Sequence, residues 1–468
     1  QIFTIFSNFG FNAALVTLIP AHLQKGRSDL ARMIYRAALL MTVVLAAVWA
    51  LLLVAAAPWI SEYLAHEPGA DDPIMLYALI IPFMALNALY AALYLGVQRG
   101  KLRAKITAAH GLLNVLLPIA AALAWRGRVL PVIGGFLTAE LFGSLLFLLF
   151  FHRKVLPRFG RARGSLTSHI SLIWRTGFLF FFANLGWNMI NSIDRLMVKF
   201  FLPVDQYGFY SMAALVITAL GIVAATAGTA LIPSLTVARE KGDQGLYDRQ
   251  VQNTSRITFM ALVPVVAMIY VASRDIFGIV LPEFIPSVRV IELLVFVGLL
   301  DIFCRVGWAS LVAYGRGGLA AIAYIGAALW NIIWNWILIP RYGIEGAAIA
   351  TLSSFLLLAL LLQVMMRTTS GTRVRVLSLL HPLMLSLLFP LLSLLLGGQG
   401  HIVRIILLFT AGPLLYLFFG IHSGLIRASD IERARAILEP RRNVPHVRLA
   451  LLFLGTLEGA RRRLRRED

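Results

Sequence analysis

Residues 178–202 read FLFFFANLGWNMINSIDRLMVKFFL, an apolar run long enough to cross a bilayer, with an aspartate, an arginine and a lysine in its second half. A charge at the centre of a spanning helix costs about 2.5–3.5 kcal/mol on insertion scales, so such side chains face protein or water. Spacings of four, three, four and four residues place five polar side chains on one helical face. They are Asn184, Asn188, Asn191, Arg195 and Lys199. The stretch therefore predicts a spanning helix with a polar stripe that ends in two cations.

Composition extends this prediction to the whole chain. Of 468 residues, 59% are hydrophobic and 14% charged, and the mean hydropathy is +0.82, which excludes a water-soluble globule and predicts an all-α, polytopic membrane protein. Windows of about 20 apolar residues predict thirteen spans, at 1–19, 37–60, 74–97, 106–125, 131–151, 176–201, 207–233, 257–280, 290–313, 319–339, 345–366, 377–396 and 403–421. Gln1 lies inside an apolar run without an initiating Met, so we expect that an N-terminal helix is missing and that the complete protein has about fourteen.

The distribution of basic residues predicts the orientation. The loops between predicted spans fall into two sets, one on each side of the membrane. The set that begins with 20–36 holds 21 Lys and Arg, and the other set holds four. The tail 422–468 adds 11. The positive-inside rule places the richer set and the tail in the cytoplasm. The net charge of +20 is therefore a topology signal and does not indicate nucleic-acid binding, which would gather the cations on one soluble domain.

A single cysteine, Cys304, excludes an intramolecular disulfide.

A weak internal repeat has an offset of 217 residues. QRGKLRAKITAAHGLLNVLL (98–117) aligns with GRGGLAAIAYIGAALWNIIW (315–334), so that Asn114 meets Asn331. The offset covers six spans, an even number, so both copies enter the membrane with the same orientation. The repeat predicts two six-helix lobes around a central cavity. The expected parts are an N-terminal lobe without its first helix (1–171), a C-terminal lobe (172–376), two additional transmembrane helices (377–421) and a basic cytoplasmic tail (422–468).

Candidate substrate-binding residues lie inside the predicted spans. Cations bind phosphate through charge-assisted hydrogen bonds, and amides and aromatic rings suit sugars. Besides the five residues of the polar stripe, the candidates are Arg305, Asn87 and Tyr90. Simpler roles stay open: Arg305 and Asp301, one turn apart, can form a structural pair, Lys199 can reach the headgroups, and asparagines can join helices.

Three acids inside spans are candidates for coupling to H⁺ or Na⁺, namely Asp194, Asp301 and Glu140. Pairing across helices is the alternative for Glu140. No catalytic or metal site and no cofactor is predicted, because the chain has no Walker-type loop, HExxH, paired cysteines or G-x-S-x-G. The acidic outer loop 62–72 could hold the metal of a lipid-linked glycosyltransferase, but it is short.

The segments SIDRLMVKFFLPVDQYGFYSMA (192–213) and ALIPSLTVAREKGD (230–243) resemble the Wzx-type polysaccharide flippases, of the superfamily that also contains multidrug extruders and the lipid II flippase. The resemblance covers the whole chain through its helix spacing. It implies an inverted-V transporter in the bacterial inner membrane that moves an isoprenoid-diphosphate-linked oligosaccharide to the outer leaflet by alternating access. It also implies that Arg195, Lys199 and Arg305 hold the diphosphate. Other membrane proteins of polysaccharide assembly are possible partners.

Two other functions remain alternatives. A multidrug or small-molecule cation antiporter of the same fold would be governed by Asp194, Asp301 and Glu140, since cationic substrates favour acidic walls. A membrane glycosyltransferase or polysaccharide polymerase, the enzyme alternative, would be expected to carry a long outer loop, and no predicted outer loop is long.

Overall fold

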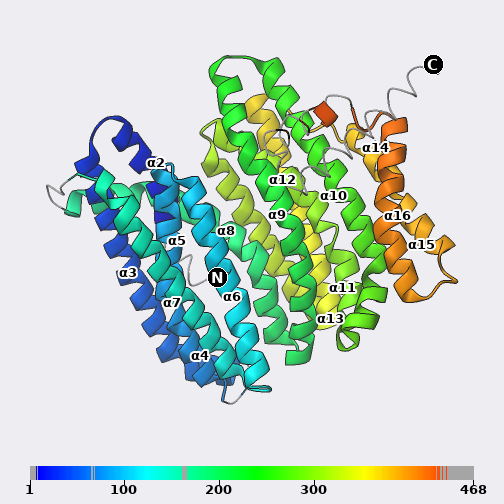
Figure 1. Ribbon diagram of the computed structural model, residues 1–468, viewed down its shortest axis with the longest axis horizontal. Helices are drawn as coiled ribbons and strands as arrows, with labels where there is room; N and C mark the ends of the chain where they lie inside the picture. The colour runs from blue at the N-terminus through cyan, green and yellow to red at the C-terminus, as the bar shows by residue number, and fades with distance from the viewer. Residues whose placement is uncertain are drawn as a thin grey trace. The chain divides into compact units, whose positions relative to one another are not determined.

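The structure is a computed structural model that describes residues 7, 9–64, 67, 69–160, 166–427, 430–432, 435 and 439. Helices dominate this part of the chain (Figure 1). In chain order they are α2 (Phe11–Gln24), α3 (Ser28–Trp59), α4 (Asp71–Ala78), α5 (Ile80–Gly96), α6 (Gly100–Ala124), α7 (Val129–Lys154), α8 (Leu166–Phe201), α9 (Val204–Glu240), α10 (Gln244–Val280), α11 (Ser287–Leu294), α12 (Val297–Ala313), α13 (Gly317–Ser370), α14 (Leu377–Ser386), α15 (Leu388–Leu395) and α16 (His401–His422). A π-helical turn, Ile60–Leu64, continues α3, and short 3₁₀ turns occupy Leu156–Arg158 and Pro282–Phe284. No strand occurs among these residues.

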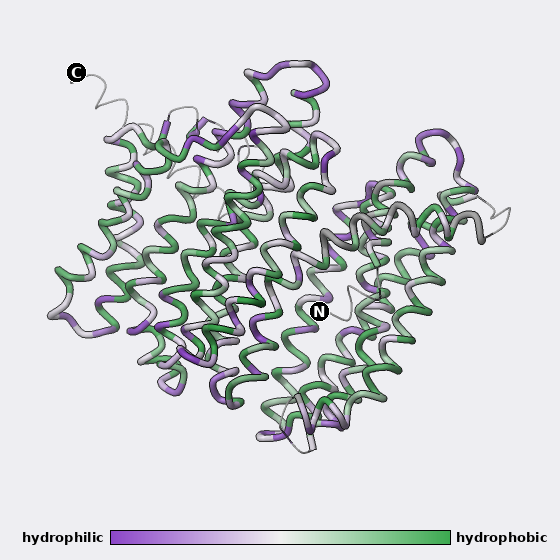
Figure 2. The backbone as a smooth tube through the Cα atoms, turned by 180° about the vertical axis from the view of Figure 1, so that it is seen from behind, coloured by the Kyte–Doolittle hydropathy of each residue, from purple (hydrophilic) through white to green (hydrophobic). Residues whose placement is uncertain are grey.

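The all-α, multi-pass membrane class is confirmed. Nine helices in the described part of the chain are long and apolar enough to cross a membrane. They match ten predicted spans, because α13 contains two. Hydrophobic residues follow the middle of the helices and hydrophilic residues gather at the turns between them (Figure 2). Of the other three predictions, 290–313 corresponds to α11 and α12, which are separated at Val295 and Phe296, and 176–201 lies within α8. The prediction at 1–19 overlaps α2 and residues outside the described part.

The division of α13 occurs at a single glycine. Gly343 has φ 58° and ψ −139°, a backbone conformation that is essentially restricted to glycine, and helical geometry resumes on either side. Predicted spans 319–339 and 345–366 meet at this residue. Gly343 therefore lets the chain turn back across the membrane without a longer loop.

A side chain at Gly343 should destabilise this turn. No atom lies within 4 Å of the position that a Cβ would take there, so the cost of Gly343→Ala is conformational, about 1–3 kcal/mol. Gly326→Ala is a matched control on the same helix, because that site is equally open and has ordinary helical angles. In detergent, the thermal unfolding midpoint should fall for Gly343→Ala and stay level or rise for Gly326→Ala. Equal midpoints would show that the turn does not depend on glycine.

The chain folds into two compact units. Unit 1 contains residues 1–202 and 318–333, and unit 2 contains residues 203–317 and 334–468. Helix α8 and the first part of α13 thus fall in unit 1, and α9 to α12 and α14 to α16 in unit 2. The predicted boundary between lobes at residue 171 stays a prediction.

Helix α3 illustrates how the sequence arranges its faces for a membrane. Its 32 residues extend about 48 Å, more than the hydrocarbon core requires. Small residues recur on the buried face at spacings of four or seven, at Ala31, Ala38, Thr42, Ala46, Ala50 and Ala57. Large apolar residues such as Leu40, Val44 and Leu51 are exposed. Small residues allow close helix packing where lipid supplies no hydrophobic driving force, so the bulky side chains are left to face acyl chains.

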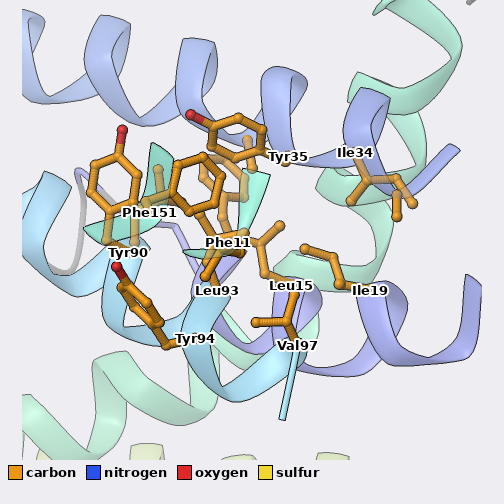
Figure 3. Close-up of a cluster of buried hydrophobic side chains, with 14 of the residues drawn as sticks. Phe11, Leu15, Ile19, Ile34, Tyr35, Tyr90, Leu93, Tyr94, Val97 and Phe151 are labelled. Carbon is orange, nitrogen blue, oxygen red and sulfur yellow. The ribbon is translucent and has the colours of Figure 1, made fainter. Parts of the chain in front are cut away.

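Each unit has its own apolar core. In unit 1, aromatic and aliphatic side chains of α2, α3, α5 and α7 interlock around Phe11, Tyr35 and Phe151 (Figure 3). In unit 2, side chains from α9, α10 and α12 pack around Leu235, Leu262 and Ile302. These cores fix the helices that carry the polar residues described next.

Candidate functional site

The polar helix of the sequence is α8, in unit 1. Asp194 is buried, and its Oδ1 accepts the backbone N–H of Arg195 at 2.8 Å. The half-buried guanidinium of Arg195 donates to Ser192 Oγ at 3.5 Å. At this end of the stripe, Asp194 thus accepts a hydrogen bond from the backbone of Arg195. The guanidinium of Arg195 extends along α8 to Ser192.

Lys199 lies one turn beyond Arg195 and contacts the acidic outer loop. Its Nζ is 3.5 Å from Glu67 Oε1, and the Glu67 side chain is 51% exposed. An ion pair this exposed contributes about 0–1 kcal/mol. A charged substrate group could therefore displace Glu67 at little cost.

The structure describes the side chain of only one of the three asparagines in the stripe. Asn188 is half-buried on α8, whereas the side chains of Asn184 and Asn191 lie outside the described part of the structure. Their helical positions agree with the predicted face. Contact of the three amides with a substrate stays a prediction.

Glu140 is the centre of a buried hydrogen-bond network within unit 1. From α5, Asn87 Nδ2 donates to Glu140 Oε2 at 2.6 Å, and from α6, Asn114 Nδ2 donates to Oε1 at 3.0 Å. His110 Nε2 lies 3.3 Å from Oε2. Ser144, one turn along α7, donates to Asn87 Oδ1 at 2.9 Å. The network joins three helices and brings together two predicted residues, Asn87 and Glu140, that are 53 positions apart.

Glycine makes room for this network. A Cβ at Gly143 would lie 2.3 Å from His110 Cδ2, so only glycine lets α7 approach the imidazole so closely. The other α5 candidate, Tyr90, is buried beside Phe151, with ring centroids 5.3 Å apart. Asn87 and Tyr90 are thus packed inside unit 1, and their role in substrate binding stays a prediction.

Replacing Glu140 should weaken unit 1. In Glu140→Gln the new amide faces the Nδ2 donors of Asn87 and Asn114, so one buried N–H loses its acceptor at a cost of about 1–3 kcal/mol. Ser144→Ala, which removes one neutral bond, is the milder control, at about 0.5–1.5 kcal/mol. Thermal unfolding in detergent should rank wild type above Ser144→Ala and Ser144→Ala above Glu140→Gln. The reverse order of the two variants would contradict a network centred on the carboxylate.

The predicted pair on α12 forms in unit 2. Arg305 Nε donates to both carboxylate oxygens of Asp301, each at 3.2 Å. Side-chain exposure is 17% for Arg305 and 4% for Asp301. Helix α9 packs closely here, because a Cβ at Gly228 would lie 2.8 Å from Arg305 Cβ. The geometry supports pairing, and it leaves a role in substrate binding untested.

Sequence reasoning missed the ionic cluster that joins α10 to α16. Asp275 is buried, and Arg404 bonds both of its oxygens, with Nε to Oδ2 at 2.5 Å. His401 Nδ1 lies 2.7 Å from Asp275 Oδ1. One signal was available, since Asp275 and Arg404 are opposite charges inside two different predicted spans. Among the described residues, no group of three or more His, Cys, Asp or Glu could hold a metal ion.

Comparisons with known proteins identify the family and the fold of the chain. The model of the family described as "Polysaccharide biosynthesis protein" matches residues 1–238. A candidate O-antigen transporter of Shigella flexneri is 25% identical over 62% of this chain and 68% of its own length. A probable low-salt glycan biosynthesis flippase of Haloferax volcanii is 28% identical over 37% of each chain. The structure of a lipid II flippase in an inward closed conformation superposes with a TM-score of 0.71, over 90% of this chain and 89% of that one, at 14% identity.

Proposed function

Because this chain belongs to the polysaccharide biosynthesis protein family, we propose that it is a flippase for an oligosaccharide linked to an isoprenoid diphosphate. The observation that carries the proposal is the combination of that family with the fold of a lipid-linked-sugar transporter. The relatives named as an O-antigen transporter and a glycan biosynthesis flippase support the same substrate class. The flippase moves its substrate between leaflets for cell-surface polysaccharide biosynthesis and leaves it chemically unchanged.

The cations inside the spans provide the means to hold the diphosphate. Arg195 and Lys199 follow one face of α8, and Arg305 is half-buried on α12. Charge-assisted hydrogen bonds to phosphate are roughly twice as strong as neutral ones, and they gain further in a water-poor site. In the absence of substrate Glu67 holds Lys199, and the diphosphate replaces Glu67 when it binds. The amides of Asn184, Asn188 and Asn191 bind the sugar hydroxyls.

Orientation follows from the loop charges. With its cation-rich loops in the cytoplasm, the protein lies in the bacterial inner membrane with its C-terminus inside. Two lobes expose the substrate path alternately to either side, which carries the glycan outward. Other membrane proteins of polysaccharide assembly are the expected source and destination of the substrate.

A proton or sodium gradient is the proposed source of energy, with Glu140, Asp194 and Asp301 as the coupling candidates. The Glu140→Gln variant tests the first of them, because it keeps the shape of the side chain and removes its charge. Transport by this variant should lose its response to the coupling gradient. An unchanged response to both pH and sodium would exclude Glu140 from coupling.

A cation antiporter of the same fold is the second candidate, and multidrug transporters are among the solved structures with this fold. Such an antiporter needs acids that are available to a cationic substrate. Glu140 accepts from two asparagines and Asp301 is paired with Arg305, so their present contacts favour the flippase.

A deletion strain distinguishes the two candidates. Cells that lack the protein should accumulate lipid-linked oligosaccharide on the inner leaflet and lose surface polysaccharide, and a copy of the gene should reverse both defects. Normal surface polysaccharide in the deletion strain, together with increased sensitivity to cationic drugs, would favour the antiporter.

A further inference from the structure

A large cavity lies within unit 2, beside helix α12. Its volume is about 1090 Å³, just above the roughly 300–1,000 Å³ typical of small-molecule pockets. Its walls come from the start of α10, from α12 and the second half of α13, and from residues 371–376, which join α13 to α14.

The α13 wall is apolar along its length and cationic at its end. Leu356, Leu360, Val364 and Arg367 line the cavity at spacings of four, four and three, so they form one stripe about 16 Å long. The three apolar side chains are about half exposed on the surface of the unit. In a membrane, this stripe is open to acyl chains from the side.

The segment between α13 and α14 adds two more cations at the polar end. Thr372 and Val374 are buried, whereas Arg373 and Arg375 are exposed and line the cavity. Because buried and exposed side chains alternate along this segment, the guanidinium groups of Arg373 and Arg375 lie on the same side of it.

Hydrogen bonds from α10 fix this segment. Gln252 Nε2 donates to the carbonyl of Arg373 at 2.7 Å, and the N–H of Arg375 donates to Gln252 Oε1 at 3.0 Å. Thr372 Oγ1 accepts from Gln244 Nε2 at 2.9 Å and donates to Asp248. The cations are thus presented by an ordered backbone.

The charge of the polar end is not neutralised by the protein. No hydrogen bond or ion pair joins the guanidinium of Arg367, Arg373 or Arg375 to any residue that the structure describes. Asp248 is the one acid among the described residues of the cavity wall, and it bonds Thr372 and Gln244. The polar end therefore carries an excess of two positive charges.

We propose that this cavity binds an anionic phospholipid of the cytoplasmic leaflet, with the headgroup phosphate on the three arginines and an acyl chain along the α13 stripe. Basic pockets between membrane helices on the cytoplasmic side suit such headgroups, and the leaflet supplies them at high concentration. Residues 441–468 of this chain are a poor alternative occupant, because eight of them are basic. The assignment rests on the proposed orientation and is independent of which substrate is transported.

Lipid binding to the purified protein tests the proposal. Phosphatidylglycerol and phosphatidylcholine with the same acyl chains would be added to delipidated protein, and the bound lipid counted by native mass spectrometry. The triple variant Arg367→Gln, Arg373→Gln, Arg375→Gln should fold, because it breaks no hydrogen bond or ion pair between these side chains and the described residues. A variant with Lys101→Gln, Arg103→Gln and Lys105→Gln removes as much charge from the first turns of α6 in unit 1, on the same predicted side.

Wild type and the unit 1 control should retain one phosphatidylglycerol at least tenfold more tightly than phosphatidylcholine, because the three arginines attract the anionic headgroup. The cavity variant should lose this preference. Equal binding of the two lipids by wild type, or an unchanged preference in the cavity variant, would overturn the proposal. Displacement of phosphatidylglycerol by a much lower concentration of an isoprenyl diphosphate would also overturn it, and would assign the cavity to the transported lipid.

Discussion

Arg404→Ala is expected to destabilise unit 2 by about 3–5 kcal/mol, the usual cost of removing one partner from a buried ion pair. Asp275 is 1% exposed at its side chain, and without Arg404 its carboxylate keeps only a contact with the largely exposed His401 among the basic side chains that the structure describes. This pair is the main ionic link between α10 and α16. The thermal unfolding midpoint in detergent measures the loss.

A double variant separates the ion pair from general packing. Because well-packed apolar residues can replace a buried pair at little cost, Asp275→Leu with Arg404→Leu should recover most of the stability lost in Arg404→Leu alone. Arg289→Ala serves as a control, since its pair with Glu292 is exposed and contributes about 0–1 kcal/mol. Equal midpoints for Arg404→Ala and Arg289→Ala would show that α16 does not depend on the buried pair.

Arg195→Ala is expected to lower the rate of flipping at limiting substrate by about 10- to 150-fold. This range corresponds to about 1.5–3 kcal/mol, the value of one hydrogen bond to a charged group. The loss should appear in transport while the protein still folds. Flipping rates would be measured with the unfolding midpoint of each variant, so that a loss of substrate binding is distinguished from a loss of protein.

Two further variants define the role of Arg195. Arg195→Lys keeps the positive charge and loses the planar guanidinium, which can donate two parallel hydrogen bonds to phosphate. The flipping rate of this variant should therefore fall between those of wild type and Arg195→Ala. Lys101→Ala removes a cation from the first turn of α6 in the same unit, on the predicted cytoplasmic side, and should leave flipping unchanged. A stable Arg195→Ala that flips at the wild-type rate would remove this residue from the substrate path.

Hydropathy was sufficient to predict the apolar part of the helices. It did not predict well the residues at which the helices begin and end. Helix α10 begins at Gln244, thirteen residues before the predicted span at 257–280. Its first turns are amphipathic, with Tyr247 and Val251 buried and Arg249 turned outward, so they extend beyond the lipid. Asp243 caps this start, since its Oδ1 accepts the N–H of Leu246 at 2.7 Å. Windows of mean hydropathy do not detect such a start.

Contacts within one helix were predictable, and contacts between helices were not. The spacing of four residues between Asp301 and Arg305 already indicated a pair, which the structure contains. The partners of Glu140 come from two other helices, and the pairing of Asp275 with Arg404 spans 129 positions. The cavity of unit 2 depends on the path of residues 371–376, which is fixed by hydrogen bonds to Gln252, more than 100 positions away.

Flipping by the purified protein in liposomes is the most direct test of the proposed function. A lipid-linked oligosaccharide with an isoprenoid diphosphate would be placed in both leaflets, and a membrane-impermeant lectin or oxidant would report how much becomes accessible from outside. Vesicles that contain the protein should expose nearly all of the glycan, whereas protein-free vesicles should expose about the outer-leaflet share. Equal accessibility in both kinds of vesicle, with folded protein and an imposed proton or sodium gradient, would contradict the flippase function.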